Sequence, residues 1–532
     1  MKPPVIAKID SLFSECDKPG SPGYALGIVA NGKIIYKRGY GMANLEHAIP
    51  ISSKSVFDIG STSKQFVAFC IAILEKKKRL SQEEPVQKHI PEMRLYKHSV
   101  TLGHLIHHTS GIRDYLTLMD LAGMRYENEY PEEEVIGLIS KQRDLNFKPG
   151  AEFLYCNSGY LLLGEVIKRV SGMSLREFAQ KNIFSPLGMK NTHFHDSFTS
   201  IVKNRASGYS VGKDGVKADV SIFDVVGDGG VNTSVEDLFL WDQNFYHNKL
   251  AGGGQKLIET ITTTGRLNDG SGINYAHGLF LGTYRGLETI THGGAWIGYR
   301  TEILRFPKNN FSVICLSNFS QANPGRIAWQ IADICLNREM SGLPLRPDSK
   351  RASLASVNKM KEIAGVYLST ESGDFFELSI KDGNLFSSSG GGSYLLDQAG
   401  PYHYIRTGGA FEIRFSAGGT KDDKTALVRE RAGKEETYKK IIPLTPSKKT
   451  SRACAGQYYS EELDIKYSIV PDKEKLFLVR KNAKREELRL LHVDLFSADW
   501  LSLRFFGGGA GRYTGFKLGA GRVKGLSFNR VG

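Results

Sequence analysis

Two stretches near the C-terminal end of the chain match each other at a fixed spacing. The segment AGVYLSTESGDFFELSIKDGNLF (364–386) resembles AGQYYSEELDIKYSIVPDKEKLF (455–477), an offset of 91 residues. Each copy later ends in a matching strand pair, EIRFSA…KTALVRERAGK and SLRFFG…RVKGLSFNR. Such a repeat indicates two copies of one folding unit. Short alternating segments with glycine-rich turns predict about eight antiparallel strands in each copy, enough to close a small barrel.

The repeat begins after a change in composition. The stretch GLPLRPDSKRASLAS (342–356) is rich in proline, serine and charge and lacks apolar periodicity, which is typical of a linker. The chain therefore divides into a first domain over 1–342, a linker over 343–356, a first barrel over 357–447 and a second over 448–532.

The first domain alternates between strand and helix patterns. An opening helix leads to two apolar strands around Asn31 and Gly32, a strong hairpin signal. A mainly helical stretch follows, and strand patterns return from Gly278 before a last helix near residue 340. This order predicts an α+β fold, in which an antiparallel sheet is flanked by helices and an all-helical region is inserted between its strands.

Composition excludes several functional classes. The net charge of +14 comes from basic residues that are scattered among acidic ones, so we expect a solvated basic surface and no nucleic-acid partner. The N-terminus lacks a signal-peptide core and no segment has the length of a membrane span, which predicts a cytoplasmic protein. The six cysteines are spread singly, so neither a zinc site nor a disulfide framework is expected.

The stretch FDIGSTSKQFVAF places Ser61 and Lys64 one helical turn apart, in front of an apolar helix. One interpretation is that Ser61 caps the helix. The other is that Ser61 is a nucleophile and Lys64 helps to remove its proton. The spacing alone does not decide, because S-x-x-K also occurs at Ser200, Ser210 and Ser356.

Two further motifs add the partners that a serine nucleophile needs. Tyr155 and Asn157 lie two apart before a long helix, where Tyr155 can move a proton and Asn157 can hydrogen-bond a substrate amide; alternatively, Asn157 caps the helix. The strand ETITHGGAWIGYR breaks at His292, and its glycines indicate a close backbone approach of the kind that an oxyanion donor requires. A strand-end turn with a surface histidine is the alternative.

The three motifs in this order resemble the penicillin-recognising serine hydrolases: class C β-lactamases, D,D-carboxypeptidases and their esterase and D-aminopeptidase relatives. Supporting segments are TLGHLIHHTSGIRDY (101–115), FKPGAEFLYCNSGY (147–160), PLGMKNTHF (186–194), GDGGVNTSVEDLFLW (227–241) and RFPKNNFSVICLSN (305–318). The resemblance covers about residues 5 to 340. It implies a β-lactamase/transpeptidase-like fold for this part of the chain.

The resemblance also implies a role for each motif. Ser61 becomes acylated, Lys64 and Tyr155 share the proton transfers, and Asn157 positions the substrate. The backbone N–H groups of Ser61 and Ala295 form the oxyanion hole.

One departure from the family pattern affects the choice of substrate. Many relatives have Lys-Thr-Gly where this chain has His292, Gly293 and Gly294, and that lysine helps to bind a substrate carboxylate. A histidine is mostly neutral near pH 7, so penicillin hydrolysis is not expected as the main activity. His292 with Gly293 and Gly294, together with two barrels, resembles the D-stereospecific aminopeptidases, in which a loop of the last barrel enters the site and favours a free amino terminus.

The loop that enters the site here has two candidates. One is HVDLFSAD, whose Asp494 and Asp499 can pair with an ammonium, and the other is the hairpin FFGGGAGR. Surface turns are the alternative for both.

The expected function is that of a serine hydrolase acting through an acyl-enzyme on an amide or peptide bond next to a D-amino acid. Rivals are an esterase or weak β-lactamase with the same site, a penicillin-binding sensor that barely turns over, and a structural or polyanion-binding role for the basic barrels. No metal or organic cofactor is implied. The expected partner is a small peptide, amide or ester substrate, and a homodimer is left open.

Overall fold

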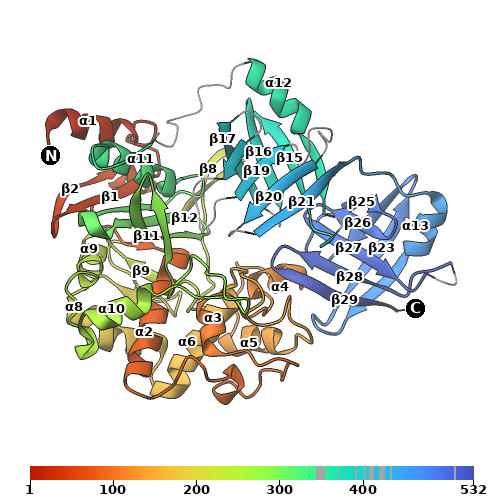
Figure 1. Ribbon diagram of the computed structural model, residues 1–532, viewed down its shortest axis with the longest axis horizontal. Helices are drawn as coiled ribbons and strands as arrows, with labels where there is room; N and C mark the ends of the chain where they lie inside the picture. Colours follow the sequence, from red (N-terminus) through yellow and green to blue (C-terminus); the bar gives the residue numbers. More distant parts are fainter. Residues whose placement is uncertain are drawn as a thin grey trace.

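A six-stranded antiparallel sheet forms the centre of the first domain in the computed structural model (Figure 1). The structure describes residues 1–342, 354–369, 371–389, 392–400, 403–406, 413–417, 426–431, 434–508 and 511–531. The strands lie in the order β10 (Phe280–Tyr284), β11 (Leu287–Trp296), β12 (Tyr299–Phe306), β13 (Phe311–Ser317), β1 (Tyr24–Ala30) and β2 (Lys33–Tyr40). The predicted hairpin joins β1 to β2, and both Asn31 and Gly32 have a positive φ, as such turns require.

Helices cover both faces of this sheet. Because side chains alternate along a strand, Leu26 and Ile28 face α1 (Pro3–Ser11) and α11 (Pro324–Leu336), whereas Ala25 and Val29 face the opposite side. On that side α9 (Val235–Asn244) packs so closely that a Cβ on Gly27 would lie 2.5 Å from Val235 Cγ1. The active-site motifs lie on this second face, next to the helical region.

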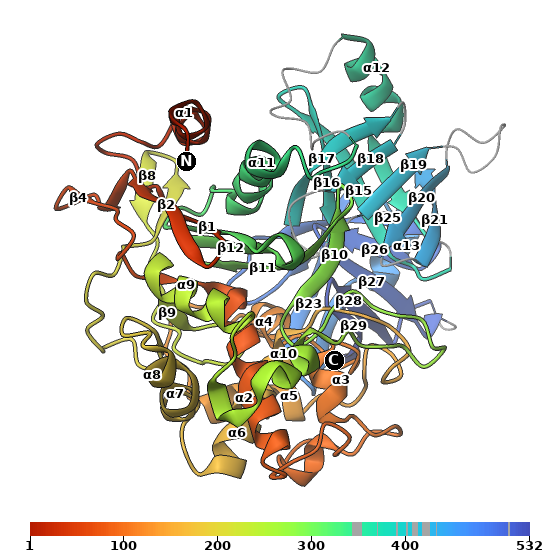
Figure 2. The same ribbon diagram turned by 60° about the vertical axis from the view of Figure 1, so that its left-hand side comes forward.

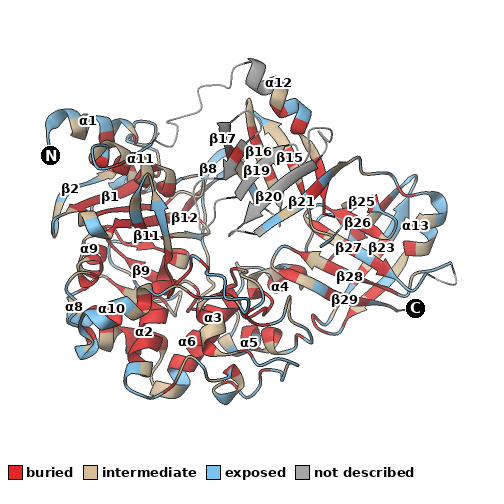
Figure 3. Cartoon of the chain, in the orientation of Figure 1, coloured by how far each residue is buried: buried red, intermediate tan, exposed pale blue. Residues whose placement is uncertain are grey.

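The helical region is inserted between β2 and β10, as the sequence predicts. Its helices are α2 (Lys64–Lys76), α3 (Leu102–Ile106), α4 (Tyr115–Leu121), α5 (Glu132–Ser140), α6 (Asn157–Ser171), α7 (Leu175–Ala179), α8 (Ser185–Leu187) and α10 (Gly254–Thr262). Short strands lie among them: β3 (Met42–Asn44), β4 (Ile49–Pro50), β5 (Phe57–Asp58), β6 (His193–Phe194), β7 (Tyr209–Gly212), β8 (Gly215–Ala218) and β9 (Val231–Thr233). Figure 3 shows α2 and α6 buried along most of their length, which makes them the core of this region.

Two closed eight-stranded barrels follow, as the repeat predicts. The first contains β14 (Gly365–Leu368), β15 (Phe375–Lys381), β16 (Asn384–Ser389), β17 (Gly392–Gly400), β18 (His403–Arg406), β19 (Ile413–Ala417), β20 (Ala426–Arg431) and β21 (Lys434–Ile441). The second contains β22 (Gly456–Ser460), β23 (Ile465–Asp472), β24 (Lys475–Val479), β25 (Glu486–His492), β26 (Leu495–Ala498), β27 (Leu501–Phe506), β28 (Gly515–Ala520) and β29 (Val523–Val531).

The two copies of the repeat also share an equivalent hydrogen bond. A helix precedes each barrel, α12 (Leu354–Ile363) and α13 (Lys448–Cys454). Tyr367 donates its hydroxyl proton to the carbonyl of Ile363 (2.8 Å), and Tyr458, 91 positions later, donates to Cys454 (2.6 Å). Helix α12 begins at Leu354, within the expected linker of residues 343–356. Residues 343–353 lie outside the described part of the chain.

The second barrel is fastened to the helical region by buried polar contacts. The Arg113 guanidinium forms an ion pair with Glu462 at 2.6 Å, and both side chains are buried. Tyr467 donates to the carbonyl of Leu121 at the end of α4 (2.6 Å). Figures 1 and 2 both show the ends of β28 and β29 directed toward this region.

Among the described residues, no helix is long and apolar enough to cross a membrane.

Candidate active site

Ser61 and Lys64 meet at the start of α2. A short 3-10 turn, Gly60–Ser63, runs directly into the helix, and the Lys64 Nζ lies 3.0 Å from the Ser61 Oγ. No side-chain cap is formed at this helix start, so the capping interpretation of Ser61 does not hold. The hydroxyl instead lies within proton-transfer distance of an amine, which is the geometry that nucleophilic catalysis needs.

Lys64 is fully buried and joins three parts of the site. Its Nζ also donates to Asn157 Oδ1 (2.9 Å) and to the carbonyl of Asp228 (2.6 Å). The Nζ thus has three hydrogen-bond partners: Ser61 Oγ, Asn157 Oδ1 and the carbonyl of Asp228. Asn157 is the first residue of α6, and its side chain contacts Lys64 and does not cap the helix. The structure thus brings together Ser61, Lys64 and Asn157.

The turn that carries Ser61 is held against β11. Gly60 has φ +48°, and a Cβ added to it would lie 2.8 Å from the backbone nitrogen of Ala295. The Gly60 N–H donates to Asp58 (2.7 Å), and the Thr301 hydroxyl donates to the carbonyl of Ile59 (3.0 Å). This close approach brings the N–H of Ala295 to the turn that carries Ser61, as an oxyanion hole made from these two residues requires.

A Gly60→Ala variant is expected to lose about 10²–10³-fold in kcat, because its Cβ forces the Ala295 N–H away from the site. The measurement is kcat on any substrate that the wild type turns over. Gly254→Ala is the matched control: Gly254 also has a positive φ, +54°, but nothing lies within 4 Å of its added Cβ. Equal losses in both variants would show that backbone strain, and not the Ala295 contact, is responsible.

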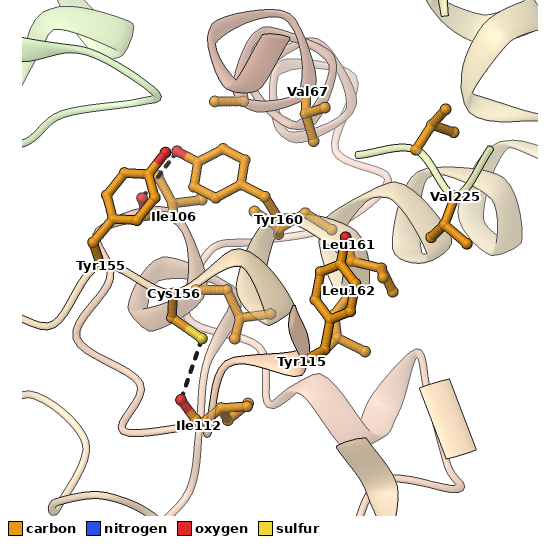
Figure 4. Close-up of a cluster of buried hydrophobic side chains, with 14 of the residues drawn as sticks. Val67, Ile106, Ile112, Tyr115, Tyr155, Cys156, Tyr160, Leu161, Leu162 and Val225 are labelled. Carbon is orange, nitrogen blue, oxygen red and sulfur yellow. Dashed lines mark hydrogen bonds between the residues drawn. The ribbon is translucent and has the colours of Figure 1, made fainter. Parts of the chain in front are cut away.

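The loop before α6 positions Tyr155. Its neighbour Cys156 receives support on both sides: the backbone N–H donates to His108 Nδ1 (3.1 Å), and Sγ contacts the carbonyl of Ile112 (3.2 Å; Figure 4). The His108 ring lies 4.2 Å from the Tyr155 ring, centroid to centroid. Lys64 Nζ lies 4.9 Å from the same ring centroid. The buried Tyr155 hydroxyl has no hydrogen-bond partner among the described residues.

His292 is buried and not a surface residue. Its Nδ1 lies 2.7 Å from the carbonyl of Gly293, and its Nε2 lies 3.2 Å from the Tyr275 hydroxyl. Burial, together with the charge of Lys64, lowers the pKa of His292 to about 3. The imidazole is therefore neutral at physiological pH, and the position holds no cation for a substrate carboxylate.

A cavity of about 1540 Å³ connects all three parts of the chain. The first domain contributes the predicted residues Ser61, Tyr155, Asn157, His292, Gly293, Gly294 and Ala295. The first barrel contributes Asp374, Phe375 and Ser393 to Leu395, and the second contributes Trp500, Ser502 and the turn Gly519 to Lys524. The barrels thus form one wall of the candidate active site.

The barrel loop that reaches the site differs from both candidates predicted from the sequence. Neither Asp494 nor Asp499 lines the cavity, and neither does any described residue of the 505–512 hairpin. Asp494 lies in the turn after β25, where Arg504 is its ion-pair partner (3.5 Å), and Asp499 lies in the turn between β26 and β27 with φ +51°. The turn between β28 and β29 enters instead and brings Arg522 to Tyr155.

The sequence motifs also missed two carboxylates. Asp114 accepts the backbone N–H of Asn157 (2.7 Å), and Asp228 accepts the Tyr115 hydroxyl (2.9 Å) in addition to its carbonyl contact with Lys64. Both lie in segments that support the family resemblance, 101–115 and 227–241, and their spacing gives no separate signal.

Among the described residues, no group of three or more His, Cys, Asp or Glu could hold a metal ion.

Comparison with known proteins agrees with this geometry. The model of the family described as Beta-lactamase matches residues 9–336, more than half of the chain. The chain belongs to the beta-lactamase family. The match ends at residue 336, before the predicted linker, so the family assignment rests on the part of the chain that carries Ser61, Lys64 and Tyr155.

Individual members of the family resemble the chain to different extents. Penicillin-binding protein 4* of Bacillus subtilis is 28% identical over 353 residues, 63% of this chain and 77% of that protein. A D-aminopeptidase of Brucella ovis is 24% identical over 538 residues, 96% of each chain. The chain spans 57 to 64% of the length of other D-aminopeptidases that it matches. An octameric penicillin-binding protein homologue from Pyrococcus abyssi shares the fold, with a TM-score of 0.57, 23% identity and coverage of 90% of this chain and 98% of its own.

Proposed function

We propose that the chain is a serine hydrolase that works through an acyl-enzyme and cleaves an amide or peptide bond next to a D-amino acid. The observation that carries the proposal is the buried Lys64 Nζ at 3.0 Å from the Ser61 Oγ, in a turn held against the backbone of Ala295. A nucleophile, an adjacent base and backbone donors are the parts that acyl transfer needs.

In this mechanism Ser61 Oγ attacks the substrate carbonyl while its proton passes to the Lys64–Tyr155 pair. The carbonyl oxygen becomes an oxyanion that accepts hydrogen bonds from the N–H groups of Ser61 and Ala295. The C–N bond then breaks, and the pair returns the proton to the leaving nitrogen. Water attacks the resulting ester along the same path, releasing the acid and restoring the Ser61 hydroxyl.

The D-amino-acid preference rests on the full-length match to a D-aminopeptidase, which includes the region of both barrels. The neutral His292 supports an amide substrate over a penicillin, because it places no positive charge beside the glycines of β11. Small peptides and amides are the proposed substrates. A homodimer, a cytoplasmic location and the absence of a nucleic-acid partner remain predictions.

The test compares turnover of D- and L-alanine p-nitroanilide, p-nitrophenyl butyrate and nitrocefin, with intact mass measured after each. We expect the D-anilide to turn over many times per chain and the L-anilide much more slowly. If only the ester or nitrocefin turns over, the peptidase proposal is wrong while the nucleophile stands. One product per chain followed by arrest would instead identify an acylating sensor.

A further inference from the structure

The turn between β28 and β29 is fixed in the active site by its backbone. The carbonyl of Arg522 accepts a hydrogen bond from Asn146 Nδ2 (2.8 Å), and the N–H of Lys524 donates to Asn146 Oδ1 (2.7 Å). The carbonyl of Lys524 accepts from two nitrogens of Arg113 (3.2 and 3.1 Å). Because these contacts use main-chain atoms on the barrel side, they hold the turn in place without using the Arg522 side chain.

The Arg522 guanidinium lies beside the residue proposed to move the proton. Its Cζ is 5.1 Å from the centroid of the Tyr155 ring, and it lines the same cavity as Ser61. Its side chain is 42% exposed, so part of the guanidinium faces the cavity. A guanidinium has five N–H donors. Among the described residues, the Arg522 side chain donates one hydrogen bond, a long one to Asp114 (3.4 Å).

Asp114 has stronger partners than Arg522. Its carboxylate accepts the N–H of Asn157 at 2.7 Å and that of Thr117 at 3.2 Å, the latter as the N-cap of α4. A charge-assisted hydrogen bond of good geometry is shorter than 3 Å. Arg522 thus forms a long ion pair with the buried Asp114 carboxylate and keeps most of its N–H donors available to an anion in the cavity.

The cavity wall also contains Arg205, Arg300 and Arg326. Arg300 donates to the carbonyls of Ile297 and Tyr299 (3.0 and 2.6 Å), and Arg205 contacts His195 Nε2 (3.3 Å). Among the described residues, Arg522 is the arginine whose guanidinium lies over the Tyr155 ring, beside the residue proposed to return the proton.

We propose that Arg522 binds a carboxylate on the leaving group of the substrate. This inference rests on the proposed function and narrows it: the favoured substrates release an amino acid or peptide with a free α-carboxylate. Tyr155 protonates the leaving nitrogen, and the α-carboxylate of the leaving amino acid lies within two bonds of that nitrogen, on the side of Arg522. A cation in this turn also argues against the predicted role of a barrel loop in binding an ammonium.

The test uses two substrates with the same scissile bond, D-alanyl-glycine and its methylamide, which lacks the carboxylate. We expect the wild type to prefer the free acid by about tenfold or more in kcat/KM, the value of one charge-assisted hydrogen bond. Arg522→Gln should abolish this preference, because the acid loses rate beyond any loss that it shares with the methylamide. Arg522→Lys should keep part of the preference, because charge remains but the bidentate geometry is lost.

Arg504→Gln is the matched control, since it removes a cation of the same barrel outside the cavity and should leave the preference unchanged. Binding of the two dipeptides is also measured by calorimetry in a Ser61→Ala background, with and without Arg522→Gln, so that the result does not depend on turnover. Tighter binding of the acid that disappears in Arg522→Gln supports the proposal even if the peptidase proposal fails. Equal binding of both dipeptides, or equal losses for both in Arg522→Gln, would overturn it.

Discussion

Replacing Ser61 by alanine is expected to lower kcat on the D-alanine anilide by about 10⁴-fold or more, because the acyl-enzyme cannot form without the Oγ. In serine hydrolases, removal of the nucleophile costs as much as removal of the whole catalytic group. The measurement is steady-state turnover together with intact mass under a slowly hydrolysed ester. The wild type should gain the mass of one acyl group, and Ser61→Ala should gain none.

Ser200→Ala provides a matched control, since Ser200 begins another S-x-x-K sequence in the same domain. Its activity and acylation should equal those of the wild type. Turnover that survives in Ser61→Ala with correct folding, judged by an unchanged thermal midpoint, would contradict the assignment of the nucleophile.

A Lys64→Met variant is expected to lose at least about 10³-fold in kcat, because it removes both the proton acceptor for Ser61 and the donor to Asn157. Methionine fills a similar volume without a charge. The carbonyl of Asp228 and Asn157 Oδ1 would then be buried without their donor, which costs about 1–3 kcal/mol of unfolding free energy. Urea unfolding measures this loss alongside the rate.

Lys203→Met serves as the control, because Lys203 is exposed and follows Ser200 at the same spacing. It should change neither the rate nor the stability. A Lys64→Met chain that is less stable but keeps wild-type kcat would show that Lys64 only holds the structure together, and the proton transfer would have to be assigned to another group.

Local patterns were enough to predict most of the fold. Asn31 and Gly32 adopt the positive φ that a tight hairpin requires, so the turn could be read from two residues. The repeat at 91 residues predicted both barrels, because the same alternation of apolar residues closes the same sheet twice. The helix that begins at Leu354 was not predicted, since it carries only a weak apolar pattern.

Local patterns were also enough to predict the contact between Ser61 and Lys64. Ser61 and Lys64 lie one turn apart on a helix, and helical geometry alone places their side chains together. Asn157 and Ala295 are distant in sequence, and only the resemblance to a known family connected them to Ser61. The structure supplies the physical connection, through the Lys64 hydrogen bond and the close approach at Gly60.

The sequence by itself determined that Ser61 and Lys64 lie together, and it predicted the α+β domain and the two barrels, because each depends on residues close together in the chain or on a repeated pattern. Only the tertiary structure decided which barrel turn completes the site. Asp494, Asp499 and Arg522 all lie in turns between consecutive strands of the second barrel, and their local sequences do not reveal which one faces Tyr155. That choice is made by how the second barrel docks, through the buried Arg113–Glu462 pair and the contacts of Asn146 with the backbone of the turn, and it places the Arg522 guanidinium beside Tyr155.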